Sequence, residues 1–346
     1  MSATPASPPK QGTARRGWRV RLTLLASAVL GTVLGAEVVL WAVDAYPPMP
    51  RSYPGDHGNR EHPTFVADAV LGWRTRPNLD IVLHGEGGAV PVLADASGRR
   101  TGRGRAKSAT RPHRVLLGGD SFIWGAGVAF EDSLAARLER RFPTLHVENV
   151  AQPGYGLDQA VLAIEHAGLQ PAPALVVLGI YPNNLGRSLT AYRADLGINK
   201  PTFRLDGGDL VQLTPDDRPT ALFRWCETHS RVWGLWRRAQ RRVGFEHGVG
   251  PWWKVNEALL ERLRTRIAAA GSRLVLVHVP LHAWRSFGGL VEYAKRHGVP
   301  LVDPVQMDRQ KPAGLYFEPA GHLTPKGHEY LADKVVAWIE RSGLGF

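Results

Sequence analysis

The sequence has 346 residues, 44% of them hydrophobic, which is enough for one large α/β domain with attached segments or for two small domains. It has 43 Lys and Arg against 31 Asp and Glu, but these basic residues lie in short scattered runs without an RNA- or DNA-binding motif, so we expect no nucleic-acid partner. The single cysteine, Cys226, excludes an intramolecular disulfide.

An apolar run at residues 22–43 follows a basic N-terminal segment. The run has 22 residues, and roughly 20 residues of helix cross a bilayer core. Basic residues precede the run and none follows it until Arg51. The positive-inside rule therefore predicts a cytoplasmic basic tail at residues 1–21 and a transmembrane anchor at 22–43. We expect a single-pass protein of the inner (cytoplasmic) membrane, with its main domain in the periplasm or outside the cell.

Glu37 stands inside this apolar run and argues against a membrane span, because an acid in mid-membrane costs a few kcal/mol. It lies near the far end of the run, where the cost is smaller. A cleaved signal peptide is the alternative, although the run is long for one and ends without a clear small-x-small site. A buried core helix is a third interpretation, which the basic flank disfavours.

The rest of the chain divides by composition and by pattern. Residues 44–64 are rich in Pro, Gly and charge and predict a linker. Short strand-like pieces, DIVLH and AVPVL, predict a small β-rich lead-in at 65–110. In residues 111–346, strands alternate with helices. The expected strands are HRVLLGG, LHVENV, ALVVLGIY, RLVLVHVP and PLVDP; the expected helices are 131–142, 157–168, 255–270, 288–297 and the closing TPKGHEYLADKVVAWIERS. This alternation predicts a three-layer α/β/α sandwich around about five parallel strands.

An insertion at about 186–250 interrupts the alternation. Within it, KPTFRLDGGDLVQL predicts a hairpin that turns at 206–208, and ALFRWCETHSRVWGLWRRAQRR predicts an amphipathic helix. The insertion is a candidate lid, a candidate partner surface, or both. Its tryptophans Trp225, Trp233 and Trp236 could stack on sugars, but we expect them to pack against the sheet.

The central chemical feature is GGDSFIWGAGV at 118–128, which places Ser121 directly after the first strand of the α/β domain, at the turn into a helix. Ligands of open α/β sheets bind beyond the carboxyl ends of the strands, and a helix N-terminus offers N–H groups to a developing oxyanion. A helix-capping serine is the structural alternative. Three further segments occur at the same edge in chain order: NVAQPGYG after the second strand, YPNN after the third, and GHLTPKGH before the last helix.

With these four segments, residues 114–342 resemble the SGNH/GDSL hydrolase family. VLGWRTRPN, ASGRR and the KPTFRLDGGDLVQL insertion are similar to membrane-anchored bacterial members related to polysaccharide O-acetyl esterases and acyltransferases, and extend the resemblance to about residue 66. The resemblance implies the SGNH hydrolase fold with its parallel, flavodoxin-like sheet, and an enzyme that acts on ester bonds. We expect no cofactor.

Site roles follow from the resemblance residue by residue. It implies Ser121 as the catalytic nucleophile and His322 as its base. The backbone N–H groups of Ser121 and Gly154 and the side-chain amide of Asn183 would form the oxyanion hole. Gly156 is the alternative to Gly154 if the turn is shifted. His328, six residues after His322, is poorly placed to share a metal with it and is assigned to the helix surface or to packing. No His/Cys/Asp cluster has metal spacing, so we expect no metal.

The acid that normally orients the histidine is missing from its usual place. The family carries Asp three residues before the histidine, or two before it, and Pro319 and Ala320 stand at these positions here. Three arrangements stay open: Glu318 reaches the ring, Asp303 supplies the carboxylate, or a backbone carbonyl orients the ring in a Ser–His dyad. The missing acid also motivates the hypothesis of a non-catalytic glycan-binding or scaffold protein.

Resemblance and topology together predict a serine esterase that removes acyl groups, in particular acetyl groups, from envelope or secreted glycans or from another small ester. An O-acyltransferase is the alternative. It would use the same residues to acylate a polysaccharide beside a partner membrane acyltransferase.

Overall fold

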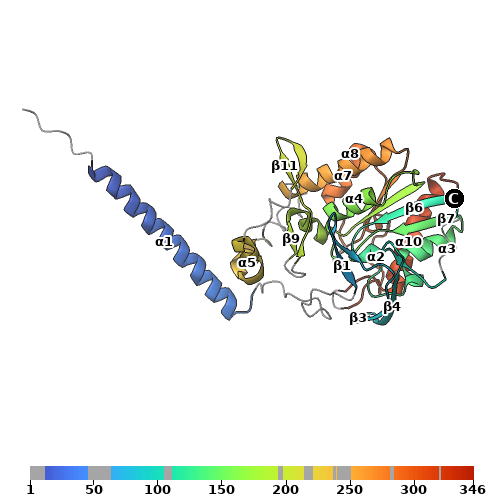
Figure 1. The fold of residues 1–346 in the computed structure, drawn as a ribbon, viewed down its shortest axis with the longest axis horizontal. Helices are drawn as coiled ribbons and strands as arrows, with labels where there is room; N and C mark the ends of the chain where they lie inside the picture. The colour runs from blue at the N-terminus through green and yellow to red at the C-terminus, as the bar shows by residue number, and fades with distance from the viewer. Residues whose placement is uncertain are drawn as a thin grey trace, which may run out of the picture.

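The computed structural model describes residues 12–45, 64–104, 111–193, 198–213, 221–236, 239, 251–280, 284–318 and 321–346. Most of the linker predicted at 44–64 and the last part of the insertion lie outside these residues. Figure 1 shows one long N-terminal helix that projects from an α/β body.

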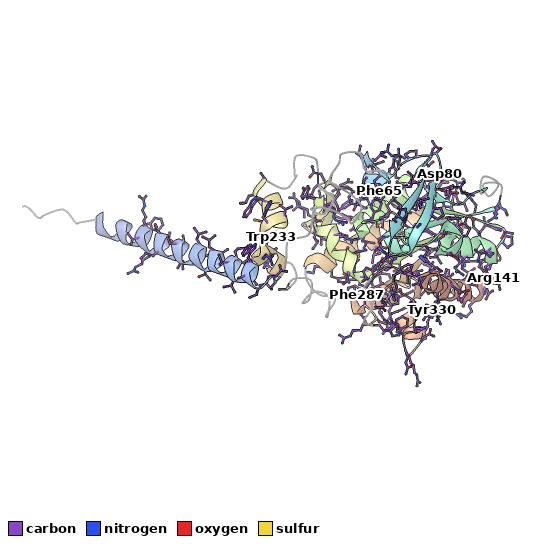
Figure 2. The ribbon with its side chains drawn as sticks, turned by 90° about the horizontal axis from the view of Figure 1, so that it is seen from below. Phe65, Asp80, Arg141, Trp233, Phe287 and Tyr330 are labelled. Atoms are coloured by element: carbon purple, nitrogen blue, oxygen red, sulfur yellow. The ribbon has the colours of Figure 1, made fainter. Side chains whose placement is uncertain are left out.

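The projecting helix is α1 (Gly12–Ala42). It begins well before residue 22, so residues 12–21, which we assigned to a basic tail, are helical; their Ala and Arg residues favour a helix. Its apolar part, Trp18–Ala42, has 25 residues, of which none is buried inside the protein. At 1.5 Å per residue this part is about 37 Å long, enough to cross a bilayer core. Figure 2 shows its side chains pointing outward on all sides.

Five parallel strands form the central sheet. They are β6 (His113–Gly118), β7 (Leu145–Asn149), β8 (Leu175–Ile180), β13 (Leu274–His278) and β14 (Leu301–Val302). Their spatial order is β14-β13-β8-β6-β7, and every neighbouring pair is parallel. The first strand of the domain thus lies between the second and the third, which is the doubly wound, flavodoxin-like order. The predicted α/β fold with about five parallel strands is confirmed.

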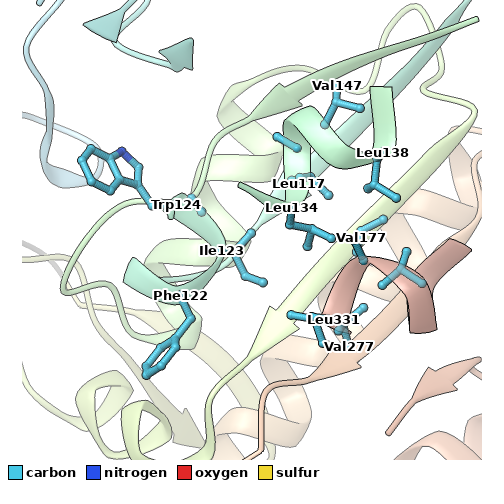
Figure 3. Packing of buried hydrophobic residues seen from close by; sticks show 14 of the residues in the cluster. Leu117, Phe122, Ile123, Trp124, Leu134, Leu138, Val147, Val177, Val277 and Leu331 are labelled. Carbon is cyan, nitrogen blue, oxygen red and sulfur yellow. The ribbon is translucent and has the colours of Figure 1, made fainter. Parts of the chain in front are cut away.

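Helices cover both faces of this sheet. They are α3 (Leu134–Arg141), α4 (Leu157–His166), α7 (Pro251–Ala269), α8 (Gly288–His297) and α10 (Pro325–Arg341). Successive strand residues point to opposite faces, so Leu116 and Val176 lie in a cluster with α4, α7 and α8. Val177 and Val277 lie in a second cluster with α3 and α10, shown in Figure 3. Because both faces are buried along β8 and β13, these two strands are apolar almost throughout, whereas β7 alternates buried and half-buried residues.

Side-chain caps mark where two of these helices begin. Thr324 caps α10 by accepting the Gly327 N–H at 3.1 Å, with Pro325 in the first turn, as the sequence predicts. The helix predicted from residue 131 begins at Leu134 instead. Ser133 caps it, and the preceding residues form a separate 3-10 turn, η2 (Phe130–Asp132).

The lead-in consists of two small antiparallel sheets that pack on the body. One is the hairpin of β1 (Phe65–Asp68) and β2 (Gly72–Thr75); the other contains β3 (Asp80–Gly85), β4 (Gly88–Ala94) and β5 (Arg100–Thr101). The predicted strands DIVLH and AVPVL correspond to β3 and β4. Trp73 of the lead-in is fully buried in one core cluster and Val92 is buried in the other. The lead-in is therefore part of the folded core.

The described part of the insertion contains two hairpins and a helical segment. The hairpins are β9 (Tyr192–Arg193) with β10 (Ile198–Asn199), and β11 (Phe203–Asp206) with β12 (Asp209–Gln212). The second turns at Gly207 and Gly208, as predicted. The expected amphipathic helix begins as α5 (Ala221–His229) but breaks at Ser230, whose hydroxyl oxygen accepts the Trp233 N–H at 3.0 Å and starts a new helical stretch at 231–236.

Two of the insertion's tryptophans differ from expectation. Trp225 and Trp236 are 55% and 47% exposed, so they do not pack against the sheet.

Candidate active site

Ser121 is the first residue of a short helix, α2 (Ser121–Trp124), that follows β6 directly. The chain turns at Gly119, whose φ of +151° lies at the edge of the range that L side chains avoid, and where a Cβ would lie 2.7 Å from the Ile123 side chain. Asp120 caps the helix by accepting the Phe122 N–H at 2.9 Å. This turn holds Ser121 at the carboxyl end of β6, which lies between β7 and β8 in the sheet.

His322 meets Ser121 although 201 residues separate them in the chain. Its Nε2 lies 2.8 Å from Ser121 Oγ, within hydrogen-bond distance. The loop before α10 folds back on itself, since the Phe317 N–H donates to the His322 carbonyl at 2.9 Å. The imidazole also lies against the Phe122 ring, with 4.9 Å between ring centroids. Backbone and side chain of the histidine are both held in place.

Glu86 contacts the far side of the same imidazole. Its Oε1 hydrogen-bonds with His322 Nδ1, and its Oε2 accepts the His322 backbone N–H at 3.0 Å. An ionised carboxylate only accepts hydrogen bonds, so the proton of the neutral ring is on Nδ1, and Nε2 can accept from the serine hydroxyl. The structure thus contains a continuous Ser121–His322–Glu86 hydrogen-bond chain.

The position of Glu86 depends on the glycines around it. It lies in the two-residue turn between β3 and β4, where Gly85 pairs with Gly88. A Cβ at Gly87 would lie 1.8 Å from the Gly127 carbonyl oxygen, and one at Gly321 would lie 2.1 Å from Glu86 Oε2. Only residues without a side chain let this turn approach the histidine so closely.

All three arrangements expected for the missing acid are therefore wrong. Glu318 is exposed and, within the described part of the chain, has no hydrogen bond to His322. Asp303 pairs with His278 Nδ1 at 2.8 Å and caps α9 (Pro304–Met307). No backbone carbonyl is needed to orient the ring. The only sequence signal for Glu86 was an acid between glycines in a predicted β-rich segment, and nothing in that pattern points to His322.

The loop after β7 carries the glycine expected to help bind the oxyanion. Gly154 has a φ of +84°, and its N–H has no hydrogen-bond partner among the described residues. Neighbours from outside the α/β core hold the loop. The Trp73 indole donates to the Pro153 carbonyl at 3.0 Å, the Arg193 guanidinium donates to the Gly154 carbonyl, and the Tyr155 hydroxyl donates to the Trp73 carbonyl at 2.6 Å. The lead-in and the insertion thus position the peptide groups on both sides of Gly154.

The asparagines of the third segment lie in η3 (Pro182–Leu189) and have different surroundings. Asn183, the expected oxyanion donor, is exposed, and its amide donates to the Tyr181 hydroxyl at 3.1 Å. Asn184 is buried, and its amide donates to the Asp120 carboxylate beside the nucleophile. Burial raises the pKa of Asp120, while the positive charge of Arg187 and the hydrogen bonds to the carboxylate oppose this rise. The contact of this segment with the serine turn therefore comes from Asn184.

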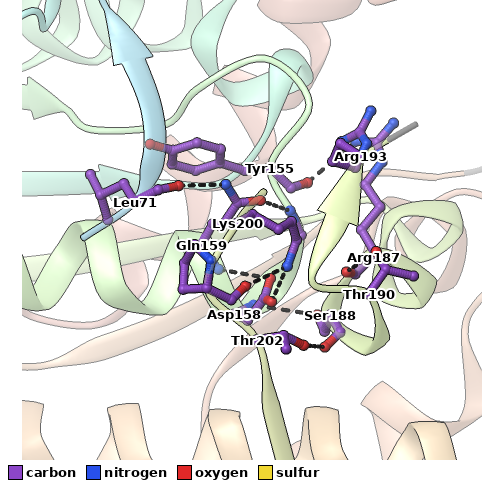
Figure 4. Close-up of polar contacts among 12 residues, drawn as sticks. Leu71, Tyr155, Asp158, Gln159, Arg187, Ser188, Thr190, Arg193, Lys200 and Thr202 are labelled. Atoms are coloured by element: carbon purple, nitrogen blue, oxygen red, sulfur yellow. Dashed lines mark hydrogen bonds and ion pairs between the residues drawn. The ribbon is translucent and has the colours of Figure 1, made fainter. Parts of the chain in front are cut away.

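A buried ion pair fixes the insertion beside the same loop (Figure 4). Lys200 donates to the carboxylate of Asp158 in the first turn of α4, and neither side chain is exposed to solvent. Burial raises the pKa of Asp158 and lowers that of Lys200, and the attraction between the two charges opposes both shifts. Since desolvation offsets much of the attraction in such a pair, we assign it to positioning: it holds the insertion against the start of α4, directly after Gly156.

His328 lies in α10 with its side chain fully buried, so of the two interpretations only packing is correct. Neither ring nitrogen has a hydrogen-bond partner among the described residues, and burial lowers its pKa to about 3. Within the described ranges no group of three or more His, Cys, Asp or Glu side chains is placed to hold a metal ion.

No protein-family model matches the chain, and no curated protein matches it in sequence. Solved structures resemble it. TesA, known from a crystal structure, is 14% identical in sequence; the match covers 66% of this chain and 99% of the TesA chain, with a TM-score of 0.41. A member of the lipolytic protein G-D-S-L family from Veillonella parvula is 11% identical, covering 66% and 100%, with a TM-score of 0.39. A lipase/acylhydrolase from Enterococcus faecalis is 13% identical, covering 67% and 97%, with a TM-score of 0.40. This likeness concerns the fold alone.

The fold and the site together define an α/β protein with a serine–histidine–glutamate site at the carboxyl ends of its parallel strands. Ester hydrolases of several unrelated folds use this arrangement of side chains.

Proposed function

We propose that this chain is a membrane-anchored serine ester hydrolase of the SGNH/GDSL type. The observation that carries the proposal is the hydrogen-bond chain at the sheet edge, in which His322 Nε2 lies 2.8 Å from Ser121 Oγ and the Glu86 carboxylate holds Nδ1. A nucleophile, a base that can take its proton and a group that orients the base are the parts that acyl transfer needs.

The reaction has two halves. In the first, His322 Nε2 takes the proton of Ser121 as Oγ attacks the ester carbonyl carbon, and the imidazolium then returns this proton to the departing alcohol. In the second, His322 takes a proton from water, the resulting hydroxide attacks the acyl-serine, and the proton goes back to Oγ as the carboxylic acid leaves. Glu86 stabilises the imidazolium in both halves and keeps the ring in the required tautomer.

The oxyanion would be bound by N–H groups at the start of α2 and on the adjacent loops. We assign this role to the backbone N–H groups of Ser121 and Gly154 and to the amide of Asn183, which has a second N–H besides the one on Tyr181. The fixed carbonyls on both sides of Gly154 support this assignment, because preorganised donors stabilise a transition state without reorganising during the reaction.

The substrate we propose is a short acyl ester, in particular an O-acetyl group on an envelope or secreted glycan. The basic flank and the length of α1 favour an inner-membrane protein with its N-terminus in the cytoplasm, so the site would face the periplasm or the cell exterior, where such glycans are found.

A fluorophosphonate probe tests the catalytic part of the proposal on the full chain in detergent. We expect labelling of the wild type, none in Ser121→Ala, and much slower labelling in His322→Ala. Hydrolysis of p-nitrophenyl acetate should likewise be absent in Ser121→Ala and much slower in His322→Ala than in the wild type. Esters with longer acyl chains should react more slowly than the acetate. A folded wild-type protein that neither labels nor hydrolyses acetyl esters would contradict the proposal. Formation of a new ester on an added sugar, instead of acetate, would assign the site to a transferase.

A further inference from the structure

The C-terminal end of α1 is joined to the insertion by an acid inside the apolar run. Glu37 lies five residues before the end of the helix, about 7 Å along its axis. Its carboxylate accepts the Ser230 hydroxyl, the Arg231 N–H at 2.9 Å and the Val232 N–H at 3.1 Å. Glu37, which argued against a membrane span, therefore has three hydrogen-bond donors: the Ser230 hydroxyl and two backbone N–H groups in the first turn of the stretch 231–236.

Arg231 makes the second part of this junction. Its guanidinium donates to the Leu40 and Ala45 carbonyls at 3.2 and 2.9 Å and to the Asp44 carboxylate at 2.9 Å. Leu40 is in the last turn of α1, where its carbonyl also accepts the Ala45 N–H at 2.9 Å, and Ala45 lies just beyond the helix. The Arg231 side chain is only 11% exposed. These hydrogen bonds between the end of the helix and the insertion fix α5 and 231–236 beside the end of α1.

The segment held in this way exposes apolar side chains. Leu222 is 70% exposed, Trp225 55%, Leu235 37% and Trp236 47%. Figures 1 and 2 show α5 and Trp233 next to the end of α1, apart from the α/β body. Trp41, on the last turn of α1, is itself 73% exposed. Tryptophan is enriched where a membrane meets water, because its ring is apolar and its N–H is polar.

We propose that the segment 221–236 is a membrane-surface element that lies in the headgroup region of the leaflet in which α1 ends. Leu222, Trp225, Leu235 and Trp236 enter the boundary between headgroups and acyl chains. The occupant is lipid because Glu37 and Arg231 tie the segment to the end of a helix long enough to span a bilayer. Arg237, Arg238, Arg241 and Arg242 follow directly in the sequence, a composition that favours anionic headgroups. The inference rests on the membrane anchoring within the proposed function and is independent of the catalytic roles.

Depth-dependent fluorescence quenching tests this on the full chain. Cys226→Ala removes the native thiol, and single cysteines are then introduced as L222C, W236C, V33C and V82C and labelled with nitrobenzoxadiazole. Val33 lies within α1, and Val82 is a 56% exposed apolar residue on β3, which makes it a matched control on the α/β body. Each protein is reconstituted into phosphatidylcholine–phosphatidylglycerol vesicles with or without brominated acyl chains, and iodide serves as the aqueous quencher.

We expect the labels at 222 and 236 to lose fluorescence in brominated lipid and to resist iodide, and the label at 82 to behave in the opposite way. If 222 and 236 are quenched by iodide like 82 while 33 is quenched by brominated lipid, α1 spans the membrane and the surface element is refuted. If 33 also escapes the brominated lipid, the anchoring itself fails, and this inference fails with it. Esterase activity is unaffected by either outcome, so the catalytic proposal is judged separately.

Discussion

Replacing Glu86 by glutamine tests whether the carboxylate from the lead-in is the acid of the site. The glutamine keeps the size of the side chain and can still accept the His322 backbone N–H, which Glu86 Oε2 accepts at 3.0 Å. It removes the negative charge beside Nδ1 and can turn an NH₂ group toward the ring, which favours the tautomer that cannot take the proton of Ser121. The perturbation therefore changes the charge and the hydrogen bonding of the imidazole with little change in packing.

The expected loss is smaller than in a buried triad. Removing the acid of a buried Ser–His–Asp triad lowers kcat by about 10⁴. The side chains of Glu86 and His322 are 29% and 21% exposed, so water solvates part of the imidazolium charge that the glutamate otherwise stabilises. We expect E86Q to lower kcat by about 10² to 10³, equivalent to about 3–4 kcal/mol of transition-state stabilisation, with KM almost unchanged.

The assay is hydrolysis of p-nitrophenyl acetate, with the rate of fluorophosphonate labelling as a second readout that reports the reactivity of Ser121. Glu318→Gln is the matched control, because Glu318 is exposed and does not contact His322, and it should keep wild-type activity. Thermal melting confirms that both variants fold. A folded E86Q protein with activity within threefold of wild type would refute the role of Glu86, as would a large loss in E318Q alone.

Three further predictions concern stability and loop position. Burial favours protonation of Glu148, but its hydrogen bonds and the charges of partners such as Arg114 outweigh burial and lower its pKa to about 2 from 4.5. The ionised carboxylate therefore stabilises the folded state fully above pH 4.5, and this contribution is lost as the pH falls toward 2. In urea denaturation, Glu148→Gln should cost about 3 kcal/mol at pH 7 and almost nothing near pH 2; an equal cost at both pH values would contradict this. Burial lowers the pKa of His328 to about 3 from 6.5, so the unfolding free energy of the wild type should decline as the pH falls below 6.5. His328→Leu should make the difference in unfolding free energy between pH 8 and pH 5 smaller by about 2 kcal/mol. An unchanged difference would count against the buried neutral ring. Arg193→Met removes the donor to the Gly154 carbonyl and should lower kcat for p-nitrophenyl acetate about tenfold through a displaced oxyanion loop, whereas a rise in KM alone would assign the arginine to substrate binding.

The sequence by itself determined the parts of this protein that depend on local pattern. The strands β8 and β13 are apolar runs because both faces of the sheet are covered there, and Thr324 with Pro325 marks the start of the last helix. Since parallel strands bring their carboxyl ends to one edge, the order of the segments was enough to predict that Ser121 and His322 lie at a common rim.

Asn183 and Asn184 show what such sequence patterns do not predict. Both follow the same strand, and the resemblance implied Asn183 as the oxyanion donor without showing which side chain contacts the serine turn. The backbone of η3 buries Asn184 against Asp120 and leaves Asn183 exposed. Which of two adjacent side chains points inward depends on a turn that propensity does not specify.

Only the tertiary structure decided the partners of Glu86 and Glu37. Glu86 lies 236 residues before His322, in a hairpin whose contact with the last loop depends on packing between two layers and on glycines that allow close approach. In the sequence, Glu37 is an acid in an apolar run with no visible partner. In the structure, its hydrogen-bond donors come from the insertion, almost 200 positions away. Hydrogen bonds over such separations carry no periodicity or spacing in the sequence, because the fold brings their partners together only after the local elements have formed.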